Sequence, residues 1–196
     1  MKDNALVLVT GATGAVGPRV VSALHEAGHP VRTLSLDAPP PDAWPQGVDS
    51  RLGDITDPAA VQAAMQGVDG VIHMAALLHI VNPPPELQSR YERINVGGTA
   101  NVVEAARQTG VGRVVFFSTI AVYGASAGGV LTEDSPLSPD SFYAQTKVDA
   151  ERVVLSAKHA DGTPLGTVLR LGAVYGARIK GNYRRLLLSL ARGRFL

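Results

Sequence analysis

The sequence predicts an α/β fold built on a doubly wound, mostly parallel sheet. Short apolar runs rich in β-branched residues alternate along the chain with longer segments of helical periodicity. The first of these runs passes into a helical segment through a glycine-rich turn, "TGATGAVG". Strand–helix–strand repetition at this spacing indicates parallel strands joined by right-handed crossovers, with helices on both faces of the sheet.

The first half of the chain begins with "ALVLVT", an apolar run at residues 5–10 that predicts a buried strand. A helix is expected over 16–28, because valine and leucine recur on one face and Gly28 ends the pattern. Further strands are expected at 31–36 and, after a proline-rich loop, near 49–52.

The second half continues the alternation. The segment "TDPAAVQAAM" predicts a helix with Asp57 as its N-cap. "GVIHMA" predicts a strand at 70–75, and a long helix is expected over 86–109. The remaining elements are a strand at 113–119, a helix at 141–160 and a strand at 165–171. Residues 1–176 are expected to form one domain, and 177–196 only the truncated start of a second one.

The composition is that of a soluble globular protein, with 45% hydrophobic and 18% charged residues. Because there is no cysteine, disulfides and thiolate chemistry are excluded, and a reducing cytoplasmic compartment fits. We see no signal peptide, and no apolar run approaches the roughly 20 residues of a membrane span. These observations predict a cytoplasmic protein without membrane contact.

Charge is distributed unevenly along the chain. Residues 1–161 carry a net charge of −6 and the remaining residues a net charge of +7. A nucleic-acid patch, a diphosphate-binding edge and a chain cut before its acidic counterpart are three explanations. The last is favoured, and no nucleic-acid partner is expected.

The glycine-rich turn has the spacing G-x-x-G-x-x-G between a strand and a helix. The first glycine permits a tight turn, the second lets the backbone approach a pyrophosphate, and the third lets the helix pack on the strand. The helix N-terminus adds free N–H groups and partial positive charge. The turn is therefore predicted to bind a dinucleotide. Its residues are Gly11, Thr13, Gly14, Ala15, Val16 and Gly17.

The ribose-binding residue is less clear from the sequence. Asp37 lies 20 positions after Gly17, where a carboxylate binds the ribose 2′-hydroxyl of NAD. However, Ser35 occupies the strand-end position that usually carries this carboxylate. Because no arginine follows to receive a 2′-phosphate, NAD is favoured and NADP stays open.

Tyr143 and Lys147 are four residues apart in a predicted helix and therefore project into the same space. A free phenol has a pKa near 10, so proton transfer at neutral pH calls for a drop of roughly 3 units, about 4 kcal/mol. A lysine ammonium about 6 Å away supplies about 3 kcal/mol at an effective dielectric of about 20. An oxidised nicotinamide ring would supply much of the rest, so the pair is a candidate acid–base device.

Seven motifs stand in one order along the chain, and together they carry a resemblance. They are "TGATGAVG", "GDITD", "HMAA", "INVGGTANVVEAA", "FFSTIAVYG", "YAQTK" and "RLGAVYG". The chain resembles the extended short-chain dehydrogenases/reductases, the NAD-dependent epimerase/dehydratase group that acts largely on nucleotide sugars. The resemblance implies a Rossmann domain at 1–176, NAD as cofactor, and a homodimer formed through helices 86–109 and 141–160. It makes 177–196 the start of a substrate-binding domain.

The resemblance also implies catalytic roles. Tyr143 would be the acid/base, and Lys147 would lower its pKa and bond the nicotinamide ribose. Thr119 would hydrogen-bond the reacting substrate oxygen, or cap a strand-end turn; Ser118, beside the cofactor, is the fallback. The phenolate would take a proton from a substrate hydroxyl while hydride passes from the carbon to nicotinamide. An epimerase would return hydride to the other face of the keto intermediate, and the sequence leaves epimerase and dehydrogenase open.

Other site residues follow from the same resemblance. Asp54 and Ile55 would hold the adenine, and Ala75 and Ala76 would pass close to the cofactor. Asn95 would be a structural and proton-relay residue, although a packing role alone is an equal alternative.

The residues after Thr119 argue against one reaction of this family, and one alternative to an enzyme stays open. A 4,6-dehydratase would carry Asp-Glu after Thr119, but Ile120 and Ala121 stand there, so dehydration is not expected. A non-catalytic dinucleotide-binding sensor or structural protein of the same fold is the alternative to an enzyme.

Two further patterns are decoys. "GASAG" matches a hydrolase nucleophile elbow at Ser126, but a loop composition follows, and His159 is the one histidine after it. The histidines show no metal-ligand spacing, so no metal is proposed. His73 is expected to be a buried, hydrogen-bonded strand residue.

Overall fold

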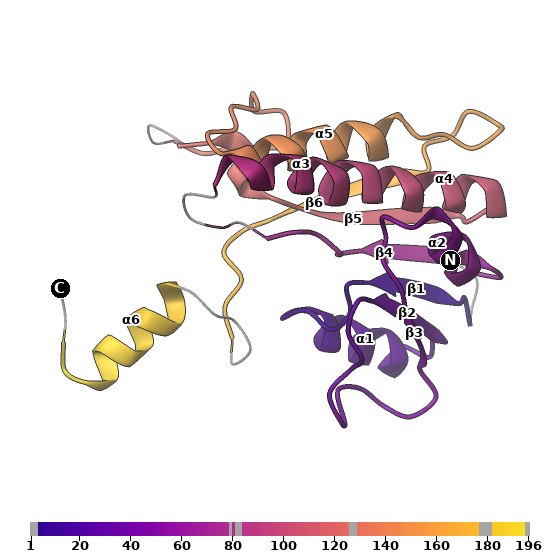
Figure 1. Cartoon of the computed structure of the whole chain (residues 1–196), viewed down its shortest axis with the longest axis horizontal. Coiled ribbons are helices and arrows are strands. Elements are labelled where there is room, and N and C mark those ends of the chain that lie inside the picture. The colour runs from indigo at the N-terminus through magenta and orange to yellow at the C-terminus, as the bar shows by residue number, and fades with distance from the viewer. Residues whose placement is uncertain (1–3, 79, 81–83, 126–128, 177–181, 195–196) are drawn as a thin grey trace.

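Six parallel strands form one sheet in the order β3-β2-β1-β4-β5-β6 (Figure 1). The computed structural model describes residues 4–78, 80, 84–125, 129–176 and 182–194. The strands are β1 (Val7–Thr10), β2 (Val31–Ser35), β3 (Asp49–Leu52), β4 (Gly70–His73), β5 (Arg113–Thr119) and β6 (Gly166–Leu171). This order confirms the predicted doubly wound sheet. It also brings the carboxyl ends of the strands to one edge, where ligands bind in such folds.

Helices cover both faces of the sheet (Figure 1). Val7 and Val9 of β1 pack with Val21 of α1 (Gly17–Glu26) on one face. On the other face, Leu8 of β1 belongs to the main core together with residues of α2 (Pro58–Met65) and α4 (Thr99–Thr109). The alternation of β1 side chains between the two faces explains why this strand is buried throughout.

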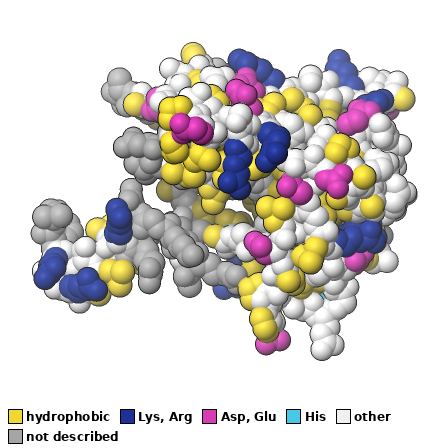
Figure 2. All heavy atoms as spheres, viewed as in Figure 1, with side chains coloured by type: hydrophobic (Ala, Val, Ile, Leu, Met, Phe, Trp, Pro, Cys, Tyr) yellow, Lys and Arg dark blue, Asp and Glu magenta, His cyan; other side chains and the backbone are white. Residues whose placement is uncertain are grey.

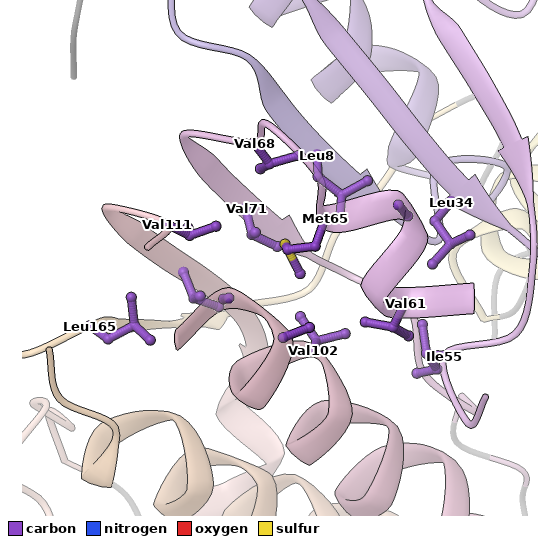
Figure 3. Packing of buried hydrophobic residues seen from close by; sticks show 14 residues of the cluster. Leu8, Leu34, Ile55, Val61, Met65, Val68, Val71, Val102, Val111 and Leu165 are labelled. Atoms are coloured by element: carbon purple, nitrogen blue, oxygen red, sulfur yellow. The ribbon is translucent and has the colours of Figure 1, made fainter. Parts of the chain in front are cut away.

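The main core lies between the sheet, α2 and α4 and extends to the β5–β6 side (Figure 3). Its side chains are aliphatic and almost fully buried, with Met65, Val61 and Leu165 each at 0% exposure. At roughly 25 cal/mol per Å² of apolar surface removed from water, such a cluster is a leading source of stability. The packed core therefore holds the strand ends in fixed positions.

The helix caps follow the sequence. Asp57 Oδ1 accepts a hydrogen bond from Ala59 N at 2.9 Å, which confirms the predicted cap of α2. Ser141 Oγ caps α5 (Phe142–Ser156) in the same way, accepting from Ala144 N at 3.2 Å. Helix α5 ends before the expected residue 160, because Lys158 instead forms an antiparallel bridge with Pro164.

The long helix predicted over 86–109 is confirmed as a continuous helical segment, but its winding changes along its length. It consists of η1 (Pro85–Leu87), α3 (Gln88–Tyr91), the π-helical η2 (Glu92–Gly98) and α4. A π turn is wider than an α turn and is frequent at functional sites. At its end a Cβ on Gly98 would lie 2.5 Å from Ile55 Cδ1, so any larger residue there would have to displace the Ile55 side chain.

The last helix, α6 (Asn182–Ala191), lies apart from the sheet in Figure 1. Four of its leucines are between 41% and 57% exposed: Leu186, Leu187, Leu188 and Leu190. The domain boundary near 176 stays a prediction.

Candidate active site

A cavity of about 520 Å³ opens at the carboxyl edge of the strands. The β1–α1 turn, the ends of β2, β4 and β5, and α5 contribute to its walls. Figure 2 shows a recess with hydrophobic side chains on this side of the molecule. The structure brings fifteen of the sixteen predicted site residues to this lining. They are Gly11, Thr13, Gly14, Ala15, Val16, Gly17, Asp37, Asp54, Ile55, Ala75, Ala76, Ser118, Thr119, Tyr143 and Lys147.

The glycine turn is built as its spacing predicts. Gly11 has φ +70, and a Cβ there would lie 2.7 Å from Ala75 Cα, so both the turn and the neighbouring strand end require glycine. A Cβ on Gly17 would lie 1.8 Å from the carbonyl oxygen of Ala12, which is why α1 can begin so close to β1. The first N–H groups of α1 are thereby held at the cavity wall.

The end of β2 carries an unpaired polar atom. Ser35 lines the cavity, and its buried Oγ has no hydrogen-bond partner within the described part of the chain. Asp37 lines the same wall with an exposed side chain. An orphaned buried hydroxyl is costly unless a ligand satisfies it. A hydroxyl beside a carboxylate at a strand end fits a ribose.

The wall next to the end of β2 is formed by the β3–α2 connection, where Gly53 N donates to Ser35 O at 3.0 Å. Asp54 Oδ1 accepts from Thr56 N at 2.8 Å, and the carbonyl of Ile55 accepts from Asn101 Nδ2 at 2.9 Å. Ile55 is buried against Gly98. These contacts fix an apolar side chain and a carboxylate at the cavity, a setting suited to a purine ring.

Lys147 is held beneath the cavity by two groups of β5. Its Nζ donates to the carbonyl oxygen of Phe117 at 2.7 Å and lies 3.9 Å from the centre of the Phe116 ring. The side chain is 2% exposed. Burial lowers the pKa of Lys147 to about 7, against an opposing effect of Glu151, which raises it.

Tyr143 lies at the same wall, one helical turn earlier. Its ring meets that of Tyr91 edge to face, with centroids 6.4 Å apart. Burial, and then the nearby Tyr91, raise the pKa of Tyr143 above its usual value. This differs from the expected lowering of the pKa by Lys147. The reason is that burial destabilises the phenolate relative to the neutral phenol.

The two hydroxyls at the end of β5 have different partners. Thr119 Oγ1 accepts from Ala121 N at 3.2 Å and so caps the turn η3 (Ile120–Tyr123), while the residue still lines the cavity. Ser118 Oγ donates to Glu151 Oε1 at 2.5 Å. The Ser118 proton is therefore committed to a carboxylate, whereas Thr119 can still donate its own to a ligand.

Asn95 is the predicted site residue that does not line the cavity. Its Oδ1 accepts from Leu77 N at 2.7 Å, and its Nδ2 donates to Leu77 O at 3.2 Å and Thr146 Oγ1 at 3.1 Å. The amide thus clamps the segment after β4 to η2 and α5. This arrangement favours the structural role over the proton relay.

Sequence reasoning missed the buried charges behind the site. Glu151 is 1% exposed and forms an ion pair with Arg170 of β6, Nη2 to Oε2 at 2.8 Å. The helical spacing Tyr143, Lys147, Glu151 was a signal for the carboxylate. Arg170 could be identified as its partner only once β6 was known to lie beside β5, and the residue pattern does not show this.

Other predictions have simpler outcomes. His73 is buried and hydrogen-bonded on both ring nitrogens, as expected. Ser126 lies outside the described residues. Within the described ranges no three His, Cys, Asp or Glu side chains are grouped so that they could hold a metal ion. In the same ranges there is no helix of the length and apolarity that crossing a membrane requires.

The family can now be stated. The model of the NAD dependent epimerase/dehydratase family matches residues 7–193. The chain belongs to this family. The parallel sheet in the described part of the chain and the glycine turn are those expected of a member of this family.

The relatives differ in substrate. A 3 beta-hydroxysteroid dehydrogenase/Delta 5-->4-isomerase of Mycobacterium tuberculosis is 34% identical over 95% of this chain and 52% of its own length. The N-acetyl-alpha-D-glucosaminyl-diphospho-ditrans,octacis-undecaprenol 4-epimerase of Escherichia coli O157:H7 is 32% identical over 100% of this chain and 56% of its own length. The chain thus spans about half the length of these relatives.

Solved structures share the fold. MoeE5 in complex with UDP-glucuronic acid and NAD has a TM-score of 0.82 and 33% identity, covering 95% of this chain and 62% of that one. WbmH of Bordetella bronchiseptica in complex with NAD+ has a TM-score of 0.81 and 26% identity, covering 97% and 64%. Both of these neighbours hold the dinucleotide that the sequence predicted for this chain.

Proposed function

We propose that this chain binds NAD and carries the acid–base residues of an oxidoreductase or epimerase. The reaction transfers hydride between nicotinamide and a carbinol carbon, and the proposed substrate is a nucleotide sugar. One observation carries the proposal: Tyr143 and Lys147 line the same cavity as the glycine turn. A nucleotide held by the turn and a substrate at Tyr143 would therefore meet in one space.

The cavity fits NAD at its described positions. The glycine turn and the start of α1 would hold the pyrophosphate, Ser35 and Asp37 a ribose, and Asp54 and Ile55 the adenine. Ala75 and Ala76 form the wall close to the cofactor. A carboxylate beside the ribose favours NAD over NADP, because it would repel a 2′-phosphate. NAD, when bound, supplies the hydride acceptor.

The protein's own residues handle the proton. The Tyr143 hydroxyl would take a proton from the substrate hydroxyl in oxidation and return it in reduction. Thr119 would donate its proton to the same substrate oxygen. Lys147, in its charged form, would stabilise the phenolate from below. A bound substrate and cofactor would displace water from the cavity and so strengthen these interactions.

The relatives support two substrate classes. MoeE5 was crystallised with UDP-glucuronic acid, and this supports a nucleotide sugar. The mycobacterial relative is named for a 3β-hydroxysteroid, which also presents a secondary carbinol. Assays of the protein with UDP-hexoses and with 3β-hydroxysteroids, followed by the absorbance of reduced nicotinamide, distinguish the two. A homodimer and a cytoplasmic location stay predictions.

The substitution Tyr143→Phe tests the proposal. It removes the proton-transfer group and keeps the ring, so turnover should fall by about 10²–10⁴-fold while NAD affinity by calorimetry stays within about twofold. Tyr175→Phe, on a 67% exposed ring outside the cavity lining, is the matched control and should keep full activity. Retained turnover in Tyr143→Phe would refute the catalytic assignment. NAD binding without turnover in the unmodified protein would favour the non-catalytic alternative.

A further inference from the structure

A third polar residue continues the face of α5 that carries Tyr143 and Lys147. Glu151 follows Lys147 by four residues, and residues at this spacing lie above one another on a helix. Unlike the other two, Glu151 does not line the cavity. It lies in the interior with 1% exposure, where a carboxylate is costly unless it is paired.

The Glu151 carboxylate is fixed from two strands. Arg170 of β6 donates from Nε to both carboxylate oxygens at 3.1 Å and from Nη2 to Oε2 at 2.8 Å. Ser118 of β5 donates to Oε1. These bonds join α5, β5 and β6 directly behind the cavity wall and leave the carboxylate little freedom to move.

The surroundings of Lys147 contain few other charges. His73 of β4 is neutral, because burial and the nearby Lys147 lower its pKa to about 3. On β5, Lys147 meets an aromatic ring and a carbonyl oxygen. Tyr143 on α5 is neutral in its acid form. Arg170 is a cation, but it is bonded to the carboxylate. Among the described residues, Glu151 is therefore the anion that faces Lys147.

We propose that Glu151 is a positioning residue that keeps the buried Lys147 ammonium charged and fixes the end of β5 beside the cavity. The inference rests on the proposed function, in which a charged Lys147 stabilises the Tyr143 phenolate. An ammonium taken out of water loses its proton more easily, and a fixed carboxylate one helical turn away opposes this loss. The carboxylate acts through Lys147 and touches neither substrate nor cofactor.

A titration of Lys147 itself tests the inference without any need for activity. The protein is labelled with ¹³C at the lysine ε-carbon, and the Lys147 resonance, assigned with Lys147→Arg, is followed against pH. In Glu151→Gln the midpoint should fall by about 1 unit or more, because the amide keeps the shape and removes the charge. Asp149→Asn, on the same helix with a partly exposed side chain paired with Arg152, should leave the midpoint unchanged. An unchanged midpoint in Glu151→Gln overturns the proposal.

A second variant covers the case in which Glu151→Gln does not fold. Glu151→Gln combined with Arg170→Gln replaces the ion pair with two amides that can bond each other. Because the charge of Glu151 raises the pKa of Lys147 and no effect of Arg170 on it is resolved, the midpoint should still fall in this double variant. A midpoint at or above that of the unmodified protein would contradict the proposal.

The pH dependence of kcat/KM measures how Glu151 affects catalysis. In Glu151→Gln the alkaline limb of kcat/KM should move to lower pH together with the Lys147 midpoint. If the resonance shifts but even the unmodified protein shows no turnover, the proposed function fails and the link between Glu151 and Lys147 stands. If turnover is normal and its pH profile does not follow the Lys147 midpoint, the inference is wrong and the proposed function stands.

Discussion

Two buried polar groups of residues lie behind the same cavity, and they differ in charge. The charged cluster consists of Lys147, Glu151, Arg170 and Ser118. The neutral cluster consists of Thr10, His73, Thr99 and Asn95. Both join the sheet to a helix. The charged cluster stands behind the residues proposed to move a proton, and the neutral cluster behind the backbone proposed to receive the cofactor.

The neutral cluster has a defined hydrogen-bond direction. Thr99 Oγ1 donates to Asn95 O at 2.6 Å, so its oxygen must accept from His73 Nε2 at 2.9 Å. His73 Nδ1 therefore accepts from Thr10 Oγ1 at 2.7 Å. The Thr10 oxygen is then left to accept from Met74 N and Ala75 N, each at 3.3 Å. A neutral His73 satisfies every member and fixes the strand end at Ala75.

The difference shows what each kind of buried polarity can do. A neutral, fully satisfied chain of hydrogen bonds positions backbone and carries no net charge. A buried ion pair also positions side chains, but its charges act on neighbouring titratable groups. The cavity has one of each. In the proposed function the neutral cluster would position the backbone that receives the cofactor, and the charged cluster would act on the proton-transfer residues.

Arg170→Met should give the largest effect of the three substitutions that follow. It leaves the buried Glu151 carboxylate without its cation, and such a loss costs about 3–5 kcal/mol of unfolding free energy. Urea denaturation followed by circular dichroism measures the change. Arg107→Met is the matched control, since its ion pair with Glu104 is half exposed, at 54% and 50%, and its midpoint should not move. Equal losses in the two variants would contradict the assigned difference between buried and exposed pairs.

The fold could be predicted from the sequence because most strands are short apolar runs between glycine- or proline-containing turns. Strand β3, with the sequence DSRL, is the polar exception. The π-helical η2 could not be predicted, since its residues keep the apolar spacing of an ordinary helix. Its position depends on Gly98 meeting Ile55, a contact between segments that lie 43 positions apart along the chain. Predicting the strand order also relied on the rule that crossovers between parallel strands are short and right-handed.

The candidate site was predictable where local motifs carry it. The glycine turn depends only on residues close to it in the sequence. Tyr143 and Lys147 likewise share a helix face because they are four residues apart. Local spacing also suggested that the pKa of Tyr143 is lowered, but burial in the folded chain raises it. Burial depends on the whole fold, which is why the electrostatics of the site, and the partner Arg170, could not be read from the residues alone.

His73→Phe should remove a pH dependence that belongs to the neutral cluster. The pKa of His73 is lowered from 6.5 to about 3 in the folded protein, so its contribution to stability is present above pH 6.5 and is lost as the pH falls toward 3. Between pH 7 and pH 4 this loss amounts to about 3 kcal/mol. Denaturation of both proteins at the two pH values measures it. A fall of the same size in His73→Phe would show that other groups cause the acid sensitivity.

Thr99→Val should give a smaller loss, which tests the assigned hydrogen bond between His73 and Thr99. The valine has the shape of threonine but leaves the His73 Nε2 proton without an acceptor, at a cost of about 1–2 kcal/mol. Thr109→Val is the matched control on the same helix, because Thr109 Oγ1 also donates to the carbonyl four residues earlier, at 2.8 Å, and no histidine donates to it. The free energy of unfolding of Thr109→Val should change by less than about 0.5 kcal/mol. Equal losses in Thr99→Val and Thr109→Val would contradict the assigned hydrogen bond between Thr99 and His73.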